Sequence, residues 1–264
     1  VVYEYAPAAD PNPEQQATKL ALSTSATPTA ETREATQANA PAADPATTTP
    51  AEGSAKKPTK NVIRVINNWV GDAAKELKIR LSNVNIKAEN AGRKAAMDVS
   101  GGGKTKVELD GQNVLDSYSV LYQAGLRKQG EGTLTITDET NDTGKKITTP
   151  KSNDSGSLIA KGAGGNGAAG IGGSVAEGTK NITIEGYATV HAAGGDWGAG
   201  IGGGGGGAGI GGGYAGNAKN IIIRGHSKVT ATATEGAAIG GGSAGWSSYY
   251  GGSAKGIVIC DHAT

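Results

Sequence analysis

The chain has 264 residues, of which 25 are Lys or Arg and 24 are Asp or Glu, so that its formal net charge is +1. This balance provides no positive field for nucleic acids or anionic membranes, and we expect neither as a partner. The single cysteine excludes an internal disulfide and a multi-cysteine metal site. No apolar run approaches the ~20 residues that a transmembrane helix requires.

Residues 1–60 differ in composition from the rest of the chain. They hold eight of the nine prolines and one glycine, together with many Ala, Thr, Gln and Glu. Such a segment cannot bury enough apolar surface to offset its ordering entropy. We therefore expect a disordered linker over 1–60 and one folded domain over 61–264. The chain begins Val-Val without a charged and apolar leader, so we expect that a secretion signal was removed or lies outside the sequence.

From residue 61 onward the sequence alternates apolar and polar residues, which is typical of half-buried strands. We expect strands, separated by turns at Gly, Asn and Asp, within 62–66, 77–88, 95–103, 104–115 and 132–138. Residues 71–76 are long enough for one helical turn. The polar residues 139–155 predict an exposed loop.

A unit of about 40 residues then occurs three times between Ala168 and Cys260. Each copy joins a run such as AGIGGG to a run such as KNITI, and the copies bring Ile182, Ile221 and Ile257 to equivalent positions. We expect these isoleucines to form one inward column. Three short strands per unit, punctuated by glycine, predict one coil of a parallel β-helix, with coils about 4.8 Å apart. The predicted fold is an all-β, right-handed parallel β-helix, preceded by a disordered segment.

Between Leu77 and Cys260 the chain contains the runs NVNIKAENAGRKAAMDVSGGG, GAAGIGG, NITIEGYATVHAAGG and NIIIRGHSKVTATA. Together these runs resemble the Gly-rich β-helical repeat domains of secreted and wall-anchored proteins of Gram-positive bacteria. The resemblance implies a secreted or cell-surface location, a larger modular parent protein, and a polysaccharide or host glycan as the partner. Such domains have no signature catalytic residues that could be assigned to positions of this chain.

Aromatic residues stand among the glycines of the repeats. A planar ring on a rigid, repeating surface suits stacking against the apolar face of a sugar, and Tyr and Trp add a polar group. The alternative is that the rings cover the glycine backbone and cap the last coil. The residues that we expect to bind glycan are Trp197, Tyr214, Trp246, Tyr249 and Tyr250.

Catalysis on such a scaffold, as in a polysaccharide lyase or glycoside hydrolase, requires paired carboxylates or a basic residue with bound Ca²⁺. The repeats offer few carboxylates, and we expect Glu185 to form an ion pair with Arg224 of the next coil. A weaker alternative is a Ca²⁺ site at Asp110 and Asp116, although Asp in such a stretch is more often a turn residue. The carboxylates available for such chemistry are Glu177, Glu185, Asp196 and Glu235 within the repeats, and Asp138, Glu139 and Asp142 in the part of the chain that precedes the repeats.

The remaining reactive side chains offer little chemistry. In the repeat alignment the histidines His191, His226 and His262 do not share a column, because His191 stands opposite Thr230 and Tyr187 stands opposite His226. We therefore expect no metal site. Cys260 is expected to be a small buried residue in the column of Ile257 and Ile259. The sequence therefore predicts a glycan-binding or adhesive module with no catalytic residues and no cofactor. A lyase or hydrolase and a purely structural stalk are the alternatives.

Overall fold

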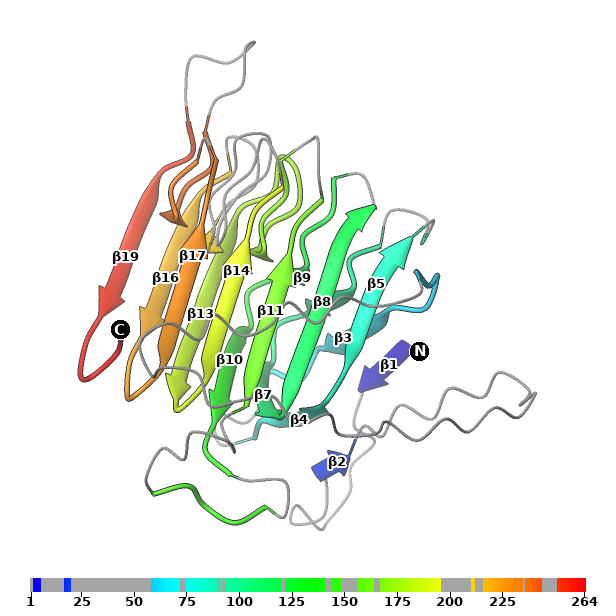
Figure 1. Ribbon diagram of the computed structural model, residues 1–264, viewed down its shortest axis with the longest axis vertical. Coiled ribbons are helices and arrows are strands. Elements are labelled where there is room, and N and C mark those ends of the chain that lie inside the picture. The colour runs from blue at the N-terminus through cyan, green and yellow to red at the C-terminus, as the bar shows by residue number, and fades with distance from the viewer. Residues whose placement is uncertain are drawn as a thin grey trace, which may run out of the picture.

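The computed structural model is all-β, because the described residues form the strands β1 to β19 and no helix (Figure 1). None of these residues therefore contributes a helix able to cross a membrane. The structure describes residues 2–5, 17–19, 58–71, 75–89, 91, 94–119, 122–140, 144–148, 156–163, 167–195, 210–211, 216–234, 236–243 and 251–264.

The strands form three sheets, A, B and C, in which neighbouring strands run parallel. Sheet A contains β1 (Val2–Tyr5), β3 (Ile63–Asn67), β6 (Met97–Ser100), β9 (Leu126–Lys128), β12 (Ile171–Gly172), β15 (Ile210–Gly211) and β18 (Ile239–Gly240). Sheet B contains β2 (Ala17–Lys19), β4 (Leu77–Ser82), β7 (Lys104–Asp110), β10 (Thr133–Asp138), β13 (Thr179–Gly186), β16 (Ala218–Ile223) and β19 (Ala254–Ile259). Sheet C contains β5 (Asn85–Glu89), β8 (Gln112–Ser119), β11 (Ser157–Lys161), β14 (Thr189–Ala193) and β17 (Lys228–Thr232).

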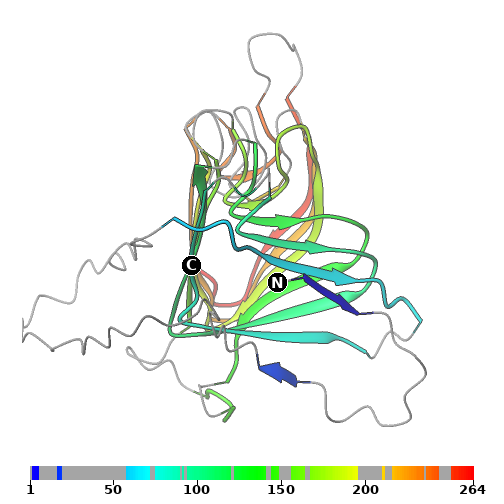
Figure 2. The same ribbon diagram turned by 90° about the vertical axis from the view of Figure 1, so that its right-hand side faces the viewer.

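From β3 to β19 the chain visits sheets A, B and C in rotation, and one such passage is here called a coil. Each strand pairs with strands three places away along the chain, as β10 does with β7 and β13. Strands that follow one another directly belong to different sheets, so no hairpin is needed and the pairing is parallel. Figure 2 looks along the stack and shows the sheets enclosing one interior.

The inward columns of sheet B confirm the alignment of the repeats. The pairing of β13 with β16, and of β16 with β19, makes Ile182, Ile221 and Ile257 neighbours. Ile182 and Ile221 are fully buried, and Ile257 on the last strand is half-buried. On the outer face Arg224 Nε donates to Glu185 Oε2 at 2.8 Å. The predicted inward column and the predicted ion pair are both present.

Two of the expected strands are divided by corners between sheets B and C. The range 77–88 is interrupted at Asn83, where φ is 53°, and the range 104–115 at Gly111, where φ is 57°. The two corners are stacked, because Asn83 Oδ1 accepts a hydrogen bond from the backbone N of Gln112 at 3.2 Å. A Cβ at Gly111 would lie 2.3 Å from that oxygen. Both the left-handed conformation and the close approach therefore favour glycine at this corner.

The described residues of the N-terminal segment form β1 and β2, at the edges of sheets A and B. β1 pairs with β3 in a register that places Tyr3 opposite Val65 and Tyr5 opposite Asn67. The rest of the segment up to residue 57 lies outside the described part of the chain, as do residues 72–74 of the expected helical turn. In the expected loop 139–155, Thr140 and Lys146 form an antiparallel bridge.

A lysine occupies a core position in sheet A. Lys128 follows Val65 and Val99 in the inward register, and it is 2% exposed. Its Nζ donates to the backbone oxygens of Gln129 and Gly130, each at 3.0 Å. Burial, and then the charge of Lys180, lower the pKa of Lys128 to about 8, because two carbonyls replace the lost hydration of the ammonium only in part.

Two adjacent substitutions test which face of β16 is inside. Ile221→Asp places an unpaired carboxylate in the core and is expected to lower the free energy of unfolding by roughly 3–5 kcal/mol. Ile222→Asp, one residue along, changes a partly exposed outer position and is expected to cost about 1 kcal/mol or less. Chemical denaturation measures both values. Equal losses would contradict the assignment of Ile221 to the interior.

Candidate functional site around sheet A

The five aromatic residues expected to bind glycan lie outside the described residues, but described strands bracket each of them along the chain. Trp197 lies between β14 and β15, in a connection from sheet C to sheet A. Tyr214 lies between β15 and β16, and Trp246, Tyr249 and Tyr250 lie between β18 and β19. Those four belong to equivalent connections from sheet A to sheet B. In chain order, Trp197 instead precedes a strand of sheet A.

The other aromatic residues follow the same distribution. The sequence has three Trp, eight Tyr and no Phe, which makes eleven rings. β1 carries two of them and β8 one, so eight lie in connections between described strands. Seven of these eight are in connections that enter or leave sheet A, including Trp69 after β3 and Tyr122 before β9. Tyr187, between sheets B and C, is the exception. In chain order, aromatic residues are therefore concentrated in the connections that enter or leave sheet A, which are here called its two borders.

Trp69 is the described example of an aromatic residue on the border between sheets A and B. Its backbone N donates to Asn67 Oδ1 at 3.1 Å, which anchors the connection to the end of β3. Lys75 Nζ lies 4.8 Å from the centre of the indole ring, within the range of a cation–π contact. The indole Nε1 is buried and has no hydrogen-bond partner. The ring is thus half-buried and held in place, and its indole N–H makes no hydrogen bond to the described residues.

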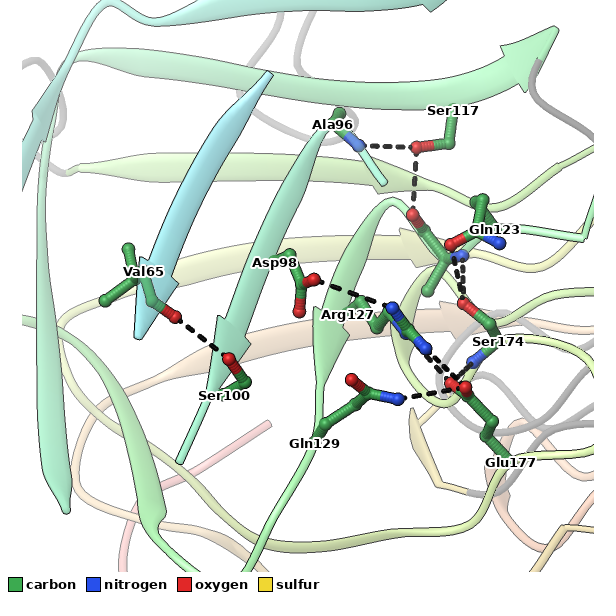
Figure 3. A network of polar contacts seen from close by, with 11 residues as sticks. Val65, Ala96, Asp98, Ser100, Ser117, Gln123, Arg127, Gln129, Ser174 and Glu177 are labelled. Atoms are coloured by element: carbon green, nitrogen blue, oxygen red, sulfur yellow. Dashed lines mark hydrogen bonds and ion pairs between the residues drawn. The ribbon is translucent and has the colours of Figure 1, made fainter. Parts of the chain in front are cut away.

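A polar network covers the outer face of sheet A (Figure 3). The pairing of β6 with β9 places Asp98 opposite Arg127. Arg127 Nε donates to Glu177 Oε2 at 2.9 Å, its Nη2 bonds Glu177 Oε1, and its Nη1 lies 3.5 Å from Asp98 Oδ2. Gln129 Nε2 also donates to Glu177 Oε1, at 2.9 Å. One guanidinium thus joins carboxylates from two different coils.

Burial and charge oppose each other at this network. Burial raises the pKa of Asp98, while Arg127 and Arg64 act in the opposite direction. Asp98 Oδ1 is buried without a hydrogen-bond partner. Burial alone would lower the pKa of Arg127, yet the hydrogen bond and the charge of Glu177 raise it above its usual value. The arrangement keeps Arg127 charged and leaves one carboxylate oxygen of Asp98 unused.

Buried serines extend the network to the border between sheets C and A. Ser117 Oγ accepts from the backbone N of Ala96 and donates to the carbonyl of Ala124, both at 2.8 Å. Ser174 Oγ accepts from the backbone N of Ala124 at 3.3 Å and donates to Gln123 Oε1 at 3.2 Å. These hydroxyls satisfy backbone groups just before β6 and β9, so the strands of sheet A enter at fixed positions.

The carboxylates of the alternative Ca²⁺ site lie apart. Asp110 ends β7 in sheet B, is 6% exposed and forms an ion pair with Arg80. Asp116 lies on β8 in sheet C, where the register places it between Lys87 and Lys161. Within the described residues, no group of three or more His, Cys, Asp or Glu is arranged to hold a metal ion. The two carboxylates therefore lie on different sheets, beside different cations.

Asp138 has the most strongly perturbed carboxyl group, at the corner between sheets B and C. It is fully buried, its Oδ2 accepts from the backbone N of Gly156 at 2.7 Å, and its Oδ1 has no partner. Burial raises the pKa of Asp138 to about 7 against the lowering effect of that hydrogen bond, and the nearby charges of Glu108 and Asp110 add to the rise. A pKa near neutrality suits acid–base chemistry, but full burial separates this carboxyl from any polymeric substrate.

The other carboxylates weighed for catalysis are engaged in bonds or lie outside the described residues. Glu177 binds Arg127, Glu185 binds Arg224, and Glu139 Oε2 accepts from Lys106 Nζ at 2.8 Å. Asp142, Asp196 and Glu235 are outside the described part of the chain. The bonded carboxylates hold adjacent coils together, a role that requires no substrate.

One expectation about the histidines is wrong. His191 does lie opposite Thr230, as expected. However, His226 and His262 stack on each other at 4.8 Å between ring centres, and Tyr187 stacks on His226 at 5.1 Å. The corners repeat as well as the strands, since positive φ at Gly186, Gly225 and Asp261 precedes each ring. The strand register already implies this column, because the pairing of Ile184 with Ile223 and of Ile223 with Ile259 carries Tyr187 to His226 and His226 to His262. The expectation that placed Tyr187 opposite His226 is confirmed, and the error is confined to His226 and His262.

Cys260 is half-buried rather than buried. Its backbone N donates to the carbonyl of Ile223 at 3.0 Å, and it follows Ile259, which pairs with Ile223. Because side chains alternate along a strand, Cys260 lies in the outward register beside Arg224 and not in the isoleucine column.

Comparison with known proteins gives this chain no relatives: family models, curated proteins and solved structures were searched, and none matches. The distribution of aromatic residues and the polar face of sheet A are therefore the features from which a function is argued.

The pKa of Asp138 predicts how the stability of the protein depends on pH. Because its folded pKa is raised, the folded state favours the protonated form, and its contribution to stability is lost as pH rises from about 4 to about 7. The loss is on the order of 4 kcal/mol at most. Asp138→Asn stays neutral and keeps an acceptor for Gly156 N–H, so its free energy of unfolding should exceed that of the wild type increasingly above pH 4.

Denaturation of both proteins at a series of pH values measures this difference. Asp261→Asn, at an exposed carboxyl, is the matched control and should follow the wild type. A constant difference between Asp138→Asn and the wild type across pH 4–8 would show that Asp138 ionises normally in the folded protein.

Proposed function

We propose that the chain is a right-handed parallel β-helix that acts as an extracellular glycan-binding module, with sheet A and its two borders as the binding face. The observation that carries the proposal is that seven of the eight aromatic residues in connections flank sheet A. This proposal keeps the resemblance to Gly-rich repeat domains of secreted and wall-anchored bacterial proteins, and with it a secreted or cell-surface location. It supposes that the module belongs to a larger protein.

The handedness rests on a general rule of topology. A connection between parallel strands of one sheet that passes over other elements is right-handed in about 98% of cases. In this chain, successive strands of each sheet are joined by such connections, which run through the other two sheets. A right-handed coil is therefore the geometry that we propose.

The chemistry of the face suits a sugar. Aromatic rings on the borders offer planar apolar surfaces for pyranose rings, and each stacking contact is worth on the order of 1 kcal/mol. On the border between sheets A and B, Gln129 and Glu177 are partly exposed amide and carboxylate groups that can bond hydroxyls. Single contacts of this size are weak, so several rings must act together to give useful affinity.

A structural stalk is the second candidate, and ion pairs between coils favour it. Arg80 with Asp110, Arg127 with Glu177 and Arg224 with Glu185 each join residues from different coils. Such pairs stiffen a stack whether or not it binds a ligand. The two candidates differ in what happens when the aromatic residues are removed.

The aromatic residues test the binding function directly. Trp197→Ala combined with Trp246→Ala removes one ring from each border of sheet A, and glycan affinity should fall at least about tenfold, which corresponds to about 1.4 kcal/mol. The melting temperature should be nearly unchanged. Binding to a glycan array, followed by calorimetric titration with the best ligand, measures the loss.

Tyr187→Leu is the matched control, because it removes a ring from the corner between sheets B and C, and it should leave binding unchanged. If the double variant unfolds, the rings cover the core and the stalk function is favoured. If it binds glycan as tightly as the wild type, or if Tyr187→Leu is equally weak, the borders of sheet A are not the site.

The proposed module performs no catalysis. Because Glu177 and Glu185 are held in ion pairs, incubation of the full chain with neutral and acidic polysaccharides should release no new reducing ends or unsaturated products. Turnover that disappears in Glu177→Gln or Glu185→Gln would favour the alternative of a polysaccharide lyase or glycoside hydrolase.

A further inference from the structure

Three lysines occupy one column at the start of the strands of sheet B. The pairing of β13, β16 and β19 makes Lys180, Lys219 and Lys255 direct neighbours. The residues that precede the first two, Thr179 and Ala218, are buried, so the lysines lie in the outward register. Lys219 and Lys255 are exposed, and Lys180 is partly exposed. Neighbouring strands are about 4.8 Å apart, which brings like charges close together.

The lysine column is held in place by a bulge that repeats in each coil. Asn181 and Asn220 follow the first two lysines with φ of 58° and 54°, and Gly256 follows the third with φ of 70°. Asn220 Nδ2 donates to Asn181 Oδ1 at 3.0 Å, and Asn181 Nδ2 donates to the carbonyl of Glu131 at 2.9 Å. These amide bonds link the first two coils of the column, and the pairing of β16 with β19 sets the register of the third. The spacing of the charges is therefore set before any ligand arrives.

Within the described residues, two of the three lysines lack the acidic partners that charged residues of other columns have. On the outer face of sheet A, Arg64, Asp98 and Arg127 alternate in sign, and on sheet C, Lys87, Asp116 and Lys161 do the same. In the lysine column, Lys180 pairs with Glu131. Neither Lys219 nor Lys255 forms an ion pair within the described part of the chain.

The charges of neighbouring residues confirm that positive groups gather here. The hydrogen bond and charge of Lys180 lower the pKa of Glu131, and Lys128 and Lys219 act on it in the same direction. One carboxylate thus faces several cations. Like charges in adjacent strands repel each other and lower the stability of the fold, and no ion pair within the described residues offsets this repulsion at Lys219 and Lys255.

The lysine column lies directly after the connections that carry the aromatic residues. Tyr214 precedes Lys219 by five residues, and Tyr250 precedes Lys255 by five residues. Both tyrosines lie in connections from sheet A to sheet B, and both lysines open the next strand. The sequence therefore repeats an aromatic residue and a lysine with the same spacing in these two copies.

We propose that the lysine column of Lys180, Lys219 and Lys255 binds the carboxylate groups of an acidic polysaccharide that lies along the stack of coils. The proposal rests on the glycan-binding function proposed above and names its ligand class. A linear polymer supplies anionic groups at regular intervals, and its sugar rings face the aromatic border while its carboxylates face the lysines. The net charge of +1 does not oppose this assignment, because the positive groups are gathered locally.

Polygalacturonate is the probe that tests the column, and its fully methyl-esterified form is the matched polymer without charge. The full chain should bind polygalacturonate, should bind the ester much more weakly, and should lose affinity as salt is raised, because the contacts are exposed ion pairs. Lys219→Gln combined with Lys255→Gln should weaken binding to polygalacturonate about tenfold. Calorimetry or retention on immobilised polymer measures each affinity.

Two further double variants serve as controls. Lys219→Arg with Lys255→Arg keeps the charges and should bind within about threefold of the wild type, which shows that the effect is not one of folding. Lys78→Gln with Lys228→Gln removes two exposed charges elsewhere on sheets B and C and should bind within about twofold. If the two glutamine variants lost equal affinity for polygalacturonate, the loss would be due to the lower net charge and not to the lysine column, and the proposal would be overturned.

Two other outcomes would also overturn it. Equal binding of polygalacturonate and its ester would show that the lysines do not recognise carboxylate. Equal binding of single-stranded poly(dT) would show a site for polyanions in general and not for glycans. If the chain binds neutral glycans through Trp197 and Trp246 but not polygalacturonate, the ligand class is wrong and the glycan-binding function stands. If no glycan binds, both proposals fail.

Discussion

The parallel pairing of each strand with the strand one coil away is the constraint on which the structure depends. It places every residue about 4.8 Å from its equivalent in the next coil. The side chains at equivalent positions must therefore be compatible with each other in size and charge. Isoleucine satisfies this requirement in the interior, where Ile182, Ile221 and Ile257 pack on one another. Asparagine satisfies it at the bulge, because Asn181 accepts from the amide of Asn220 and donates to the carbonyl of Glu131.

Charge is the property that such stacking tolerates least. One outer column avoids repulsion because its charges alternate in sign, as in Arg64, Asp98 and Arg127. Ion pairs between neighbouring coils, such as Arg224 with Glu185, have the same effect. Where an ionisable group is placed inside, it is neutralised or bonded. Lys128 donates to two carbonyls and its pKa falls, and the pKa of Asp138 rises. Lys219 and Lys255 depart from this pattern, because neither forms an ion pair within the described part of the chain.

The sequence predicts the interior better than the surface. The columns of Ile182 and Ile184 could be read directly, because apolar residues recur at the same place in every copy. The corners were harder to predict. The corner at Asn83 does have a sequence signal, because Asn tolerates a left-handed backbone and the apolar–polar alternation changes phase between Leu81 and Val84, but a single residue does not show that the chain passes to another sheet there. The stacking of His226 on His262 follows from extending the register of Ile223 and Ile259 by three residues.

The candidate site could be predicted only in part, and for a physical reason. The sequence shows which residues are aromatic, but the border to which Trp197 belongs depends on which strands precede and follow it. The raised pKa of Asp138 could not be predicted at all, because it depends on burial at a corner and on carboxylates brought from β7. Contacts between residues of different coils carry no local sequence signal.

The ring column of Tyr187, His226 and His262 has a consequence for how such a fold changes over time. Rings that share a register cover one another's faces and offer a ligand only their edges. Faces become available when rings sit in connections of unequal length, and these do differ here: residues 194–209 join β14 to β15, whereas residues 233–238 join β17 to β18. We therefore expect the binding properties of related chains to change through insertions and deletions in the connections at the borders of sheet A. The residues of the strand columns should change less, because they must pack against the next coil.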